Sequence, residues 1–230
     1  MERILITGAS GGMGRAIADK LASKDRLLLL HGRNRKSLDA TSSLVKAKGA
    51  ETELLLCDFA DSGQVDTLVA KISKHPLDVL VNNAGIAVVK PLTELTLENW
   101  QQTIAINITA PFQLIKGLLP GMSSGSSLVN ILSIAAKTAF AGWSSYCMSK
   151  FALDGFTRAV REEVRSAGIR VINIYPGSTD TTMWDSAPGD WPRERMIHPE
   201  AVAEAVAMAL AQPAGVLVDD ISLGPVGGAL

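Results

Sequence analysis

Tyr146 and Lys150, in the segment "SSYCMSK" (144–150), have the residue types and spacing of an acid–base pair. Residues at i and i+4 of a helix share one face, so the ammonium can stand beside the phenol. A free tyrosine has a pKa of about 10, and a nearby cation lowers that pKa by favouring the tyrosinate. Two polar side chains on the wet face of a helix would have the same spacing. The elements around this segment must distinguish the two interpretations.

Short aliphatic runs alternate with helical patterns along the chain. The predicted strands cover 3–7, 26–31, 51–57, 78–82, 126–133, 170–175 and 215–223, and the predicted helices cover 13–22, 36–48, 62–74, 97–119, 143–166 and 199–212. Strands that are apolar throughout indicate a parallel sheet covered on both faces. The pattern therefore predicts an α/β fold, a doubly wound parallel sheet of about seven strands.

No shift in composition marks a domain boundary, so we expect residues 1–230 to form a single domain. One long irregular segment, 177–199, is rich in Pro, Gly, Asp and Thr but also carries Met183, Trp184, Trp191 and Met196. Long loops within compact domains are often functional lids. We therefore predict a lid over a substrate site, and its side chains favour an apolar or aromatic substrate.

Charge and cysteine content narrow the possible partners and location. Lys and Arg number 22 against 23 Asp and Glu, so no basic surplus indicates nucleic acid or an anionic membrane as a partner. Cys57 and Cys147 lie in apolar runs and are expected to be buried thiols in a reducing compartment. The first ten residues do not resemble a signal peptide, and "LLLL" at 27–30 is far too short to span a membrane. We expect a cytoplasmic protein.

The three histidines give no indication of a metal site. His31, His75 and His198 lack metal-ligand spacing and are interpreted as surface or loop residues.

The first predicted strand leads into a glycine-rich turn, "ITGASGGMGRAIA" (6–18). Gly8, Gly12 and Gly14 allow a tight turn, close approach of the backbone to a pyrophosphate and close helix–strand packing. The following helix offers free N–H groups and the positive end of its dipole to a phosphate. Three glycines alone are a weak signal that a surface turn would also explain. Their place between a first strand and a first helix favours dinucleotide binding.

The end of the second strand, "HGRNRK" (31–36), bears on the choice of dinucleotide. An acidic residue here would bind the adenosine ribose hydroxyls of NAD, but Gly32 and Arg33 stand in its place. A guanidinium suits a 2′-phosphate through bidentate charge-assisted hydrogen bonds. The sequence therefore favours NADP, with NAD as the alternative if the basic groups only solvate a loop.

Taken together, these motifs resemble the short-chain dehydrogenase/reductase family over nearly the whole chain. The matching features, in family order and spacing, are "TGASGGMG" (7–14), "NNAG" (82–85), Asn107, Ser133, the Tyr146–Lys150 pair and "YPGSTDTTM" (175–183). The resemblance implies an NAD(P)-dependent oxidoreductase acting on a small carbonyl or alcohol. It also implies a homodimer or homotetramer, in which the two long helices pair.

The resemblance assigns catalytic roles to four residues. Tyr146 is implied as the general acid for reduction, and Lys150 as the group that lowers its pKa and holds the nicotinamide ribose. Ser133 is implied to orient the substrate oxygen, and Asn107 to hold a water that links Lys150 to solvent. The implied cofactor contacts are Gly8, Ser10, Gly12, Met13, Gly14, Arg33, Asp58, Phe59, Asn83, Ala84, Gly85, Tyr146, Lys150, Pro176, Gly177 and Thr179.

The chain departs from the family pattern at three places. Gly11 stands where NADP-preferring members often have a basic residue, so Arg33 is the main argument for NADP. Thr179 replaces an aliphatic residue and alters the expected contact with the nicotinamide amide. The end "ISLGPVGGAL" lacks the usual Asp-Gly-Gly signature, which leaves the last strand less certain.

An NADPH-dependent ketone or aldehyde reductase is the leading hypothesis. The alternative is a dinucleotide-binding regulatory or scaffold protein without redox chemistry, which would have no need of Ser133, Tyr146 and Lys150 together. A nucleotide-sugar epimerase is a minor option, since its glycine spacing and longer substrate domain are absent. Trp143 is equally compatible with the wall of a substrate pocket and with core or lid packing.

Overall fold

One parallel sheet organises the computed structural model, which describes residues 1–213 and 215–228. Its strands, in the spatial order β3-β2-β1-β4-β5-β6-β7, are all parallel to their neighbours. In chain order they are β1 (Glu2–Ile6), β2 (Arg26–Gly32), β3 (Glu51–Leu56), β4 (Val79–Asn82), β5 (Ser127–Ile131), β6 (Arg170–Pro176) and β7 (Asp220–Leu223).

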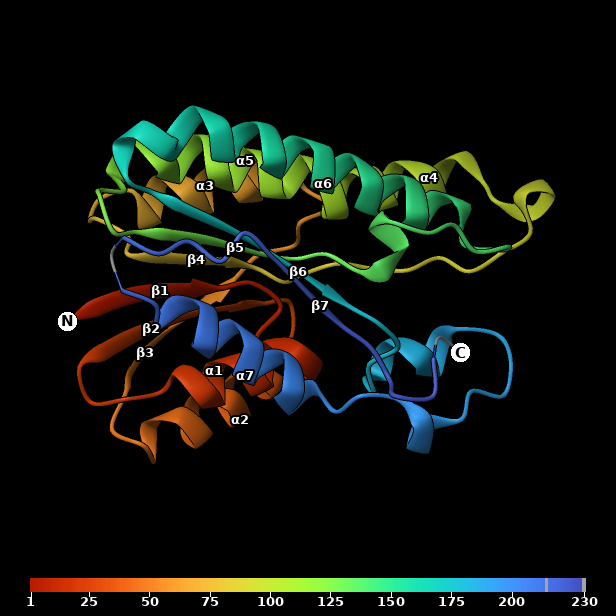
Figure 1. The fold of residues 1–230 in the computed structure, drawn as a ribbon, viewed down its shortest axis with the longest axis horizontal. Coiled ribbons are helices and arrows are strands. Elements are labelled where there is room, and N and C mark those ends of the chain that lie inside the picture. The colour runs from red at the N-terminus through yellow and green to blue at the C-terminus, as the bar shows by residue number, and fades with distance from the viewer. Residues whose placement is uncertain (214, 229–230) are drawn as a thin grey trace.

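Helices cover both faces of this sheet (Figure 1). On one face lie α1 (Gly12–Leu21), α2 (Arg35–Lys46) and α7 (Pro199–Leu210). On the other lie α3 (Ser62–Ile72), α4 (Leu97–Ile104), α5 (Ala110–Leu118) and α6 (Ser144–Val164). The predicted doubly wound α/β fold is confirmed.

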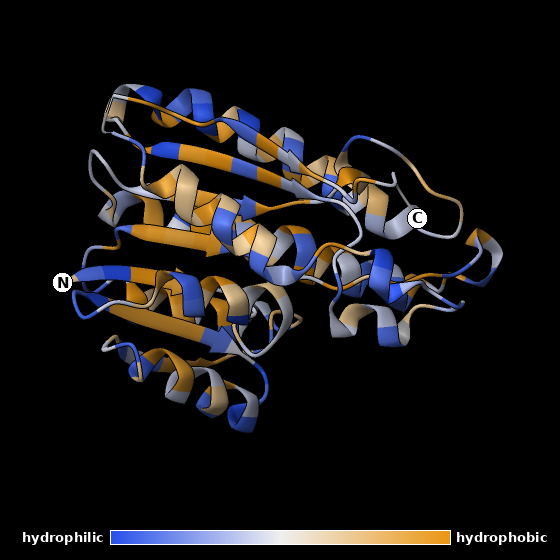
Figure 2. Ribbon diagram, turned by 60° about the horizontal axis from the view of Figure 1, so that its bottom comes forward, coloured by the Kyte–Doolittle hydropathy of each residue, from blue (hydrophilic) through white to orange (hydrophobic). Residues whose placement is uncertain are grey.

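The inner strands β1, β2, β4, β5 and β6 are mostly apolar because each face packs on its own helices (Figure 2). In β1, Ile4 and Ile6 join the core under α1, α2 and α7, while Leu5 points to the core under α3, α5 and α6. All three side chains are fully buried. This alternation repeats along β2, β4, β5 and β6, so the two cores share the sheet as a common wall.

A ladder of buried amides crosses the sheet on the α6 side. Asn82, Asn130 and Asn173 are register partners in β4, β5 and β6. Asn82 Nδ2 donates to Asn130 Oδ1, and Asn130 Nδ2 donates to Asn173 Oδ1, each at 3.0 Å. Asn173 Nδ2 in turn donates to Thr157 Oγ1 of α6 at 3.1 Å. The ladder satisfies most polar groups that burial would otherwise penalise.

Two predicted elements differ from the structure. The helix expected over 97–119 is interrupted between α4 and α5 by a π-helical turn, Ala105–Thr109, which carries Asn107. A π turn adds a residue to the helical repeat and is often found at functional sites. The last strand expected over 215–223 is limited to Asp220–Leu223, although it pairs with β6 as a parallel sheet requires.

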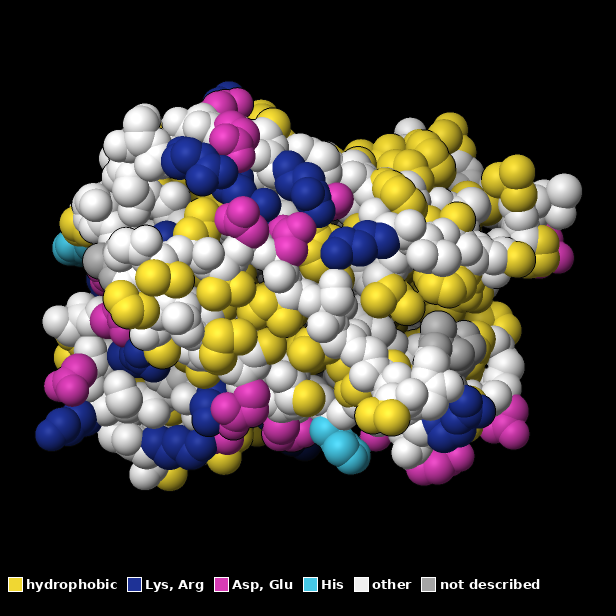
Figure 3. Space-filling view, in the orientation of Figure 1, with side chains coloured by type: hydrophobic (Ala, Val, Ile, Leu, Met, Phe, Trp, Pro, Cys, Tyr) yellow, Lys and Arg dark blue, Asp and Glu magenta, His cyan; other side chains and the backbone are white. Residues whose placement is uncertain are grey.

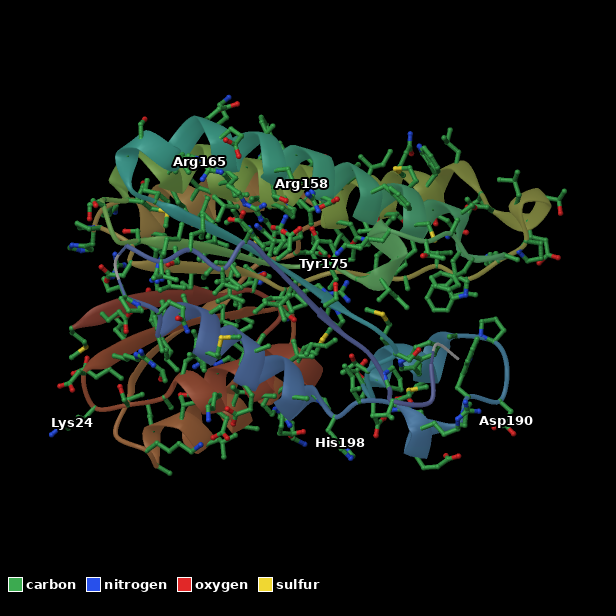
Figure 4. The ribbon with its side chains drawn as sticks, viewed as in Figure 1. Lys24, Arg158, Arg165, Tyr175, Asp190 and His198 are labelled. Carbon is green, nitrogen blue, oxygen red and sulfur yellow. The ribbon has the colours of Figure 1, made fainter. Side chains whose placement is uncertain are left out.

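The strand order reverses between β1 and β4, which marks the topological switch point of the sheet. Ligands of open parallel sheets bind beyond the carboxyl ends of the strands at this point. The segment 177–199 projects from the same end of the molecule, with Asp190 at its outer bend and His198 where it joins α7 (Figure 4). None of the described helices is long and apolar enough to cross a membrane.

Candidate active site

A cavity of about 400 Å³ opens at the switch point. Most of the predicted cofactor residues line it, namely Gly8, Ser10, Gly12, Met13, Arg33, Asp58, Phe59, Asn83, Ala84 and Gly85. Gly14 lies buried behind the turn. Tyr146, Pro176, Gly177 and Thr179 line a second, adjacent cavity instead.

The glycine turn requires glycine for backbone geometry and for space. Gly8 and Gly12 have φ values of 68° and 50°, in the left-handed region that side chains rarely adopt. A Cβ on Gly14 would collide with the carbonyl oxygen of Gly8, so the first turn of α1 packs directly on the start of the glycine turn. The cradle at the N-terminus of α1 therefore stays open for a phosphate.

Thr7 and Asn83 hold this turn against the end of β4. Thr7 Oγ1 accepts from the backbone N–H groups of Asn83 and Ala84 at 2.8 and 2.9 Å. Asn83 Nδ2 donates to the carbonyl oxygen of Thr7 at 2.8 Å. Asn83 therefore shapes the cavity chiefly by fixing its backbone, while its buried Oδ1 has no partner among the described residues.

His31 is not a surface or loop residue, and its interpretation from the sequence was wrong. It is 3% exposed, and its ring stacks on Phe59 with centroids 4.0 Å apart and an interplanar angle of 8°. Its Nδ1 accepts from Gly8 N at 3.3 Å, which leaves Nε2 to donate to the Cys57 carbonyl oxygen at 3.1 Å. Burial lowers the pKa of His31 to about 4. A neutral imidazole thus ties the glycine turn to the segment that follows β3.

The rim beside β2 has room and charge for a 2′-phosphate. A Cβ on Gly32 would lie 3.2 Å from Ser10 Cβ, so no acidic side chain fits between them without displacing Ser10. Arg33 is 61% exposed and 4.0 Å from the Asp58 carboxylate, so its guanidinium is only loosely paired. The residues present therefore fit NADP, whose phosphate would meet a cation and a hydroxyl here.

The second cavity, of about 100 Å³, lies beside the first. Ser133 and Tyr146 line it, and Met13, Thr181 and Met183 line both cavities. The two cavities therefore adjoin each other at these three side chains. The topology brings Ser133, at the end of β5, to the first turns of α6.

Tyr146 and Lys150 are both buried, at 8% and 5% exposure. Burial raises the pKa of Tyr146 to about 12, opposed by a hydrogen bond from Ser133. Burial lowers the pKa of Lys150 to about 8. The ammonium donates to the Ile131 carbonyl oxygen at 3.0 Å and lies 5.6 Å from the centre of the Tyr146 ring. The protein by itself thus keeps Tyr146 protonated, and a lowering of its pKa by Lys150 stays a prediction.

Asn107 lies under the site with its side chain fully engaged. Its Nδ2 donates to the Ile86 carbonyl oxygen and to Ser149 Oγ, and its Oδ1 accepts from Ile86 N, each at 2.9 Å. A water-holding role for Asn107 stays a prediction. Because its side chain is already hydrogen-bonded, the main-chain carbonyl oxygen of Asn107 would have to bind the water.

Four aromatic side chains form one cluster over the second cavity. Trp143 contacts Tyr146, Trp184 and Trp191, with ring centroids 5.6, 5.6 and 6.4 Å apart. All four line the cavity, so Trp143 is part of its wall. Met196, which the sequence also suggested as a substrate contact, is buried beside Ile197 at a different cavity.

A glycine turn shaped for a phosphate at the switch point, next to a cavity lined by Ser133 and Tyr146, defines a dinucleotide-binding oxidoreductase of the doubly wound class. Lys150 lines neither cavity but is buried one helical turn from Tyr146. The chain belongs to the short chain dehydrogenase family, whose profile matches residues 2–190.

Individual relatives agree with this assignment. A sepiapterin reductase from Chlorobaculum tepidum is 34% identical over 236 residues, covering 98% of this chain and 96% of that protein. The crystal structure of a short chain dehydrogenase from Burkholderia cenocepacia in complex with NADP has a TM-score of 0.87 at 28% identity, covering 96% of each chain. An alcohol dehydrogenase from Thermococcus sibiricus, complexed with 5-hydroxy-NADP, has a TM-score of 0.90 at 27% identity, covering 100% and 99%.

Proposed function

We propose that this protein reduces a small ketone or aldehyde to an alcohol with NADPH. The observation that carries the proposal is the adjacency of the two cavities, which puts Ser133 and Tyr146 on the substrate side and the glycine turn on the cofactor side. The complexes of similar proteins with NADP and 5-hydroxy-NADP support the choice of dinucleotide.

The residues that would hold the dinucleotide divide by location. The turn at Gly8, Gly12 and Gly14 would take the pyrophosphate, and Ser10 and Arg33 the 2′-phosphate. Asp58, Phe59 and the segment 83–85 would take the adenosine, while Pro176, Gly177 and Thr179 would lie near the nicotinamide. The bound nicotinamide supplies the hydride.

Proton delivery would come from Tyr146. Its raised pKa keeps the phenol protonated near neutral pH, so it can donate to the carbonyl oxygen as negative charge develops there. Ser133 would donate a second hydrogen bond to the same oxygen. Lys150 would hold the ribose and stabilise the tyrosinate left after proton transfer, since a cation favours that form.

The broader organisation is part of the proposal. Residues 1–230 would act as one domain, with 177–199 as its lid. The free, buried thiols Cys57 and Cys147 support a reducing, cytoplasmic location. The substrate would be a small molecule, with no nucleic acid or membrane partner.

A panel of ketones and aldehydes tests the reaction, with NADPH or NADH as the reductant. We expect turnover with NADPH and a higher kcat/KM than with NADH. No turnover with either cofactor on any substrate, with NADPH still bound, would favour the regulatory or scaffold alternative.

Arg33→Ala tests the cofactor assignment. Loss of one charge-assisted contact at an exposed site should weaken NADPH binding about tenfold and leave NADH binding unchanged. Arg35→Ala is the matched control, because Arg35 is exposed nearby but pairs with Asp39 at 3.3 Å. Unchanged NADPH affinity in Arg33→Ala, measured by calorimetry, would remove Arg33 from the phosphate site.

A further inference from the structure

The wall of the second cavity is aromatic on two sides. Trp143 precedes α6 and stands three residues before Tyr146, with their rings at 65°. Trp184 and Trp191 come from the segment 177–199 and contact each other at 4.8 Å. One indole is therefore fixed to the element that carries Tyr146, and two belong to the segment that covers it.

The same wall is free of charge. None of the described residues that line this cavity is Lys, Arg, Asp, Glu or His. A carboxylate or phosphate on the substrate would be buried there without a partner, at a high desolvation cost. The chemistry of the wall therefore selects a neutral substrate.

The N–H groups of the two covering indoles differ. Trp184 Nε1 donates to the Thr179 carbonyl oxygen at 2.8 Å, which fixes that ring. Trp191 Nε1 is buried without a partner among the described residues. A buried donor without an acceptor is unfavourable, so the Trp191 ring has less to hold it in its present position. Trp191 is the ring that a ligand can most readily displace.

We propose that the substrate is a neutral aryl ketone or aldehyde whose carbonyl is attached directly to the ring. The ring would lie against Trp143, with Trp184 and Trp191 closing over it. A ring on Trp143 lies beside Tyr146, one helical turn further along, so an attached carbonyl reaches the phenol and Ser133. This inference rests on the proposed reductase function, because it identifies the substrate class of the same site.

Two ketones of matched size separate aromatic recognition from simple apolar fit. Acetophenone and cyclohexyl methyl ketone differ in whether the ring is flat and conjugated. Contacts between aromatic rings favour the former beyond the area buried, so we expect kcat/KM with NADPH to be about tenfold higher for acetophenone. Equal kcat/KM values for the two ketones would overturn the inference while leaving the reductase function intact.

Variants then locate the preference. In Trp143→Leu, which loses the aromatic contact, kcat/KM for acetophenone should be within about twofold of that for cyclohexyl methyl ketone. Trp143→Phe should retain most of the preference for acetophenone. Trp100→Leu is the matched control, because Trp100 lies in α4 outside this cavity and should keep the wild-type preference. A preference unchanged in Trp143→Leu and Trp191→Leu would also overturn the inference. If Trp143→Leu fails to fold, Trp191→Leu in the covering segment gives the answer.

A binding measurement separates this inference from the reaction itself. Calorimetry of both ketones on Tyr146→Phe saturated with NADP⁺ needs no turnover. We expect acetophenone to bind about tenfold more tightly. This result together with no reduction by the wild-type protein would refute the proposed reaction but support the aromatic site. Equal binding would refute the aromatic site whatever the kinetics.

Discussion

Tyr146 combines two properties that a proton donor needs. It is buried beside Ser133, and burial raises its pKa to about 12, so it holds its proton throughout the neutral range. Lys150 is buried as well, and burial lowers its pKa to about 8. Because this value still lies above 7, most Lys150 side chains are positively charged near neutral pH. These opposite shifts place a protonated phenol near a cation in an apolar pocket. That arrangement suits reduction, in which the phenol gives up its proton and the ammonium offsets the resulting charge.

His31 gives a prediction at the same scale, because its pKa of about 4 in the folded protein lies below the ordinary value of 6.5. The folded state disfavours the protonated ring, so the stability that His31 contributes is complete above about pH 6.5. This contribution to the free energy of unfolding, about 3 kcal/mol in all, is lost progressively as pH falls from 6.5 to 4. In His31→Phe, which can still stack on Phe59, the free energy of unfolding should lack this part of the pH dependence.

Urea unfolding between pH 7 and 4 checks this expectation. His75→Phe removes an exposed histidine and serves as the control, with a profile parallel to that of the wild type. A constant difference in unfolding free energy between wild type and His31→Phe over this range would contradict the assigned protonation state.

Ser133, Tyr146 and Lys150 were grouped from the sequence through the family resemblance, because the Tyr146–Lys150 spacing alone also fits the wet face of a helix. His31 was missed because a histidine at a strand end looks the same in sequence whether it is solvated or stacked. The available signal of burial was the run of four leucines, 27–30, directly before His31.

At the scale of elements, the segment 177–199 is held by a bridge between its two ends and by the contacts of Arg193. Thr179 and Ile197 form a bridge, with Asp180 N donating to the Ile197 carbonyl oxygen at 2.9 Å. Arg193 pairs with Asp180 and Asp185 and donates to the Thr181 carbonyl oxygen at 2.9 Å. Thr181 packs against Gly12, since a Cβ on that glycine would lie 3.1 Å from Thr181 Cγ2. One arginine thus links the covering segment to the residues that line both cavities.

Arg193→Ala should therefore loosen the cover. Each exposed ion pair contributes little, but loss of this small network should raise KM for the ketone about fivefold with a smaller change in kcat. Cleavage within the segment in limited proteolysis should also become faster. Arg195→Ala, an exposed change on the same turn, is the control. Unchanged KM and proteolysis in Arg193→Ala would mean that Arg193 does not hold the cover.

Alternation of aliphatic runs and helices predicted every major element, but not the details that depend on tertiary contacts. The π turn at Asn107 leaves no mark in a hydrophobic pattern that continues through it. The amide ladder could have been noticed, because Asn82, Asn130 and Asn173 each fall within an otherwise apolar strand of the sheet. The strand register that aligns them follows from the packing of the whole sheet.

For the whole molecule, hydrophobic and charged side chains are unevenly distributed over the surface (Figure 3). Hydrophobic side chains gather at the upper right, beside α4, whereas charged side chains are frequent over α6 and along the lower edge of this view. On the outer helices, Phe112 of α5 and Phe151 of α6 are 43% and 46% exposed. Exposed large aromatic side chains on neighbouring helices favour contact with another protein surface.

We therefore expect a homodimer or homotetramer that pairs through α5 and α6. Light scattering at micromolar concentration should give at least twice the mass of the 24.3 kDa chain. The double change of Phe112 and Phe151 to Glu should lower that mass, because it buries charge in the contact. Leu56→Glu, at an exposed position on the edge strand β3, should leave the measured mass unchanged. A wild-type monomer would contradict this expectation.

Proton donation by Tyr146 is the central step of the proposed reaction, and Tyr146→Phe tests it directly. The substitution removes one hydroxyl and keeps the ring that packs against Trp143. We predict that kcat for ketone reduction with NADPH falls by about a thousandfold, while the Kd for NADPH changes less than about threefold. Activity of Tyr146→Phe within about tenfold of wild type would contradict the central claim that this phenol delivers the proton.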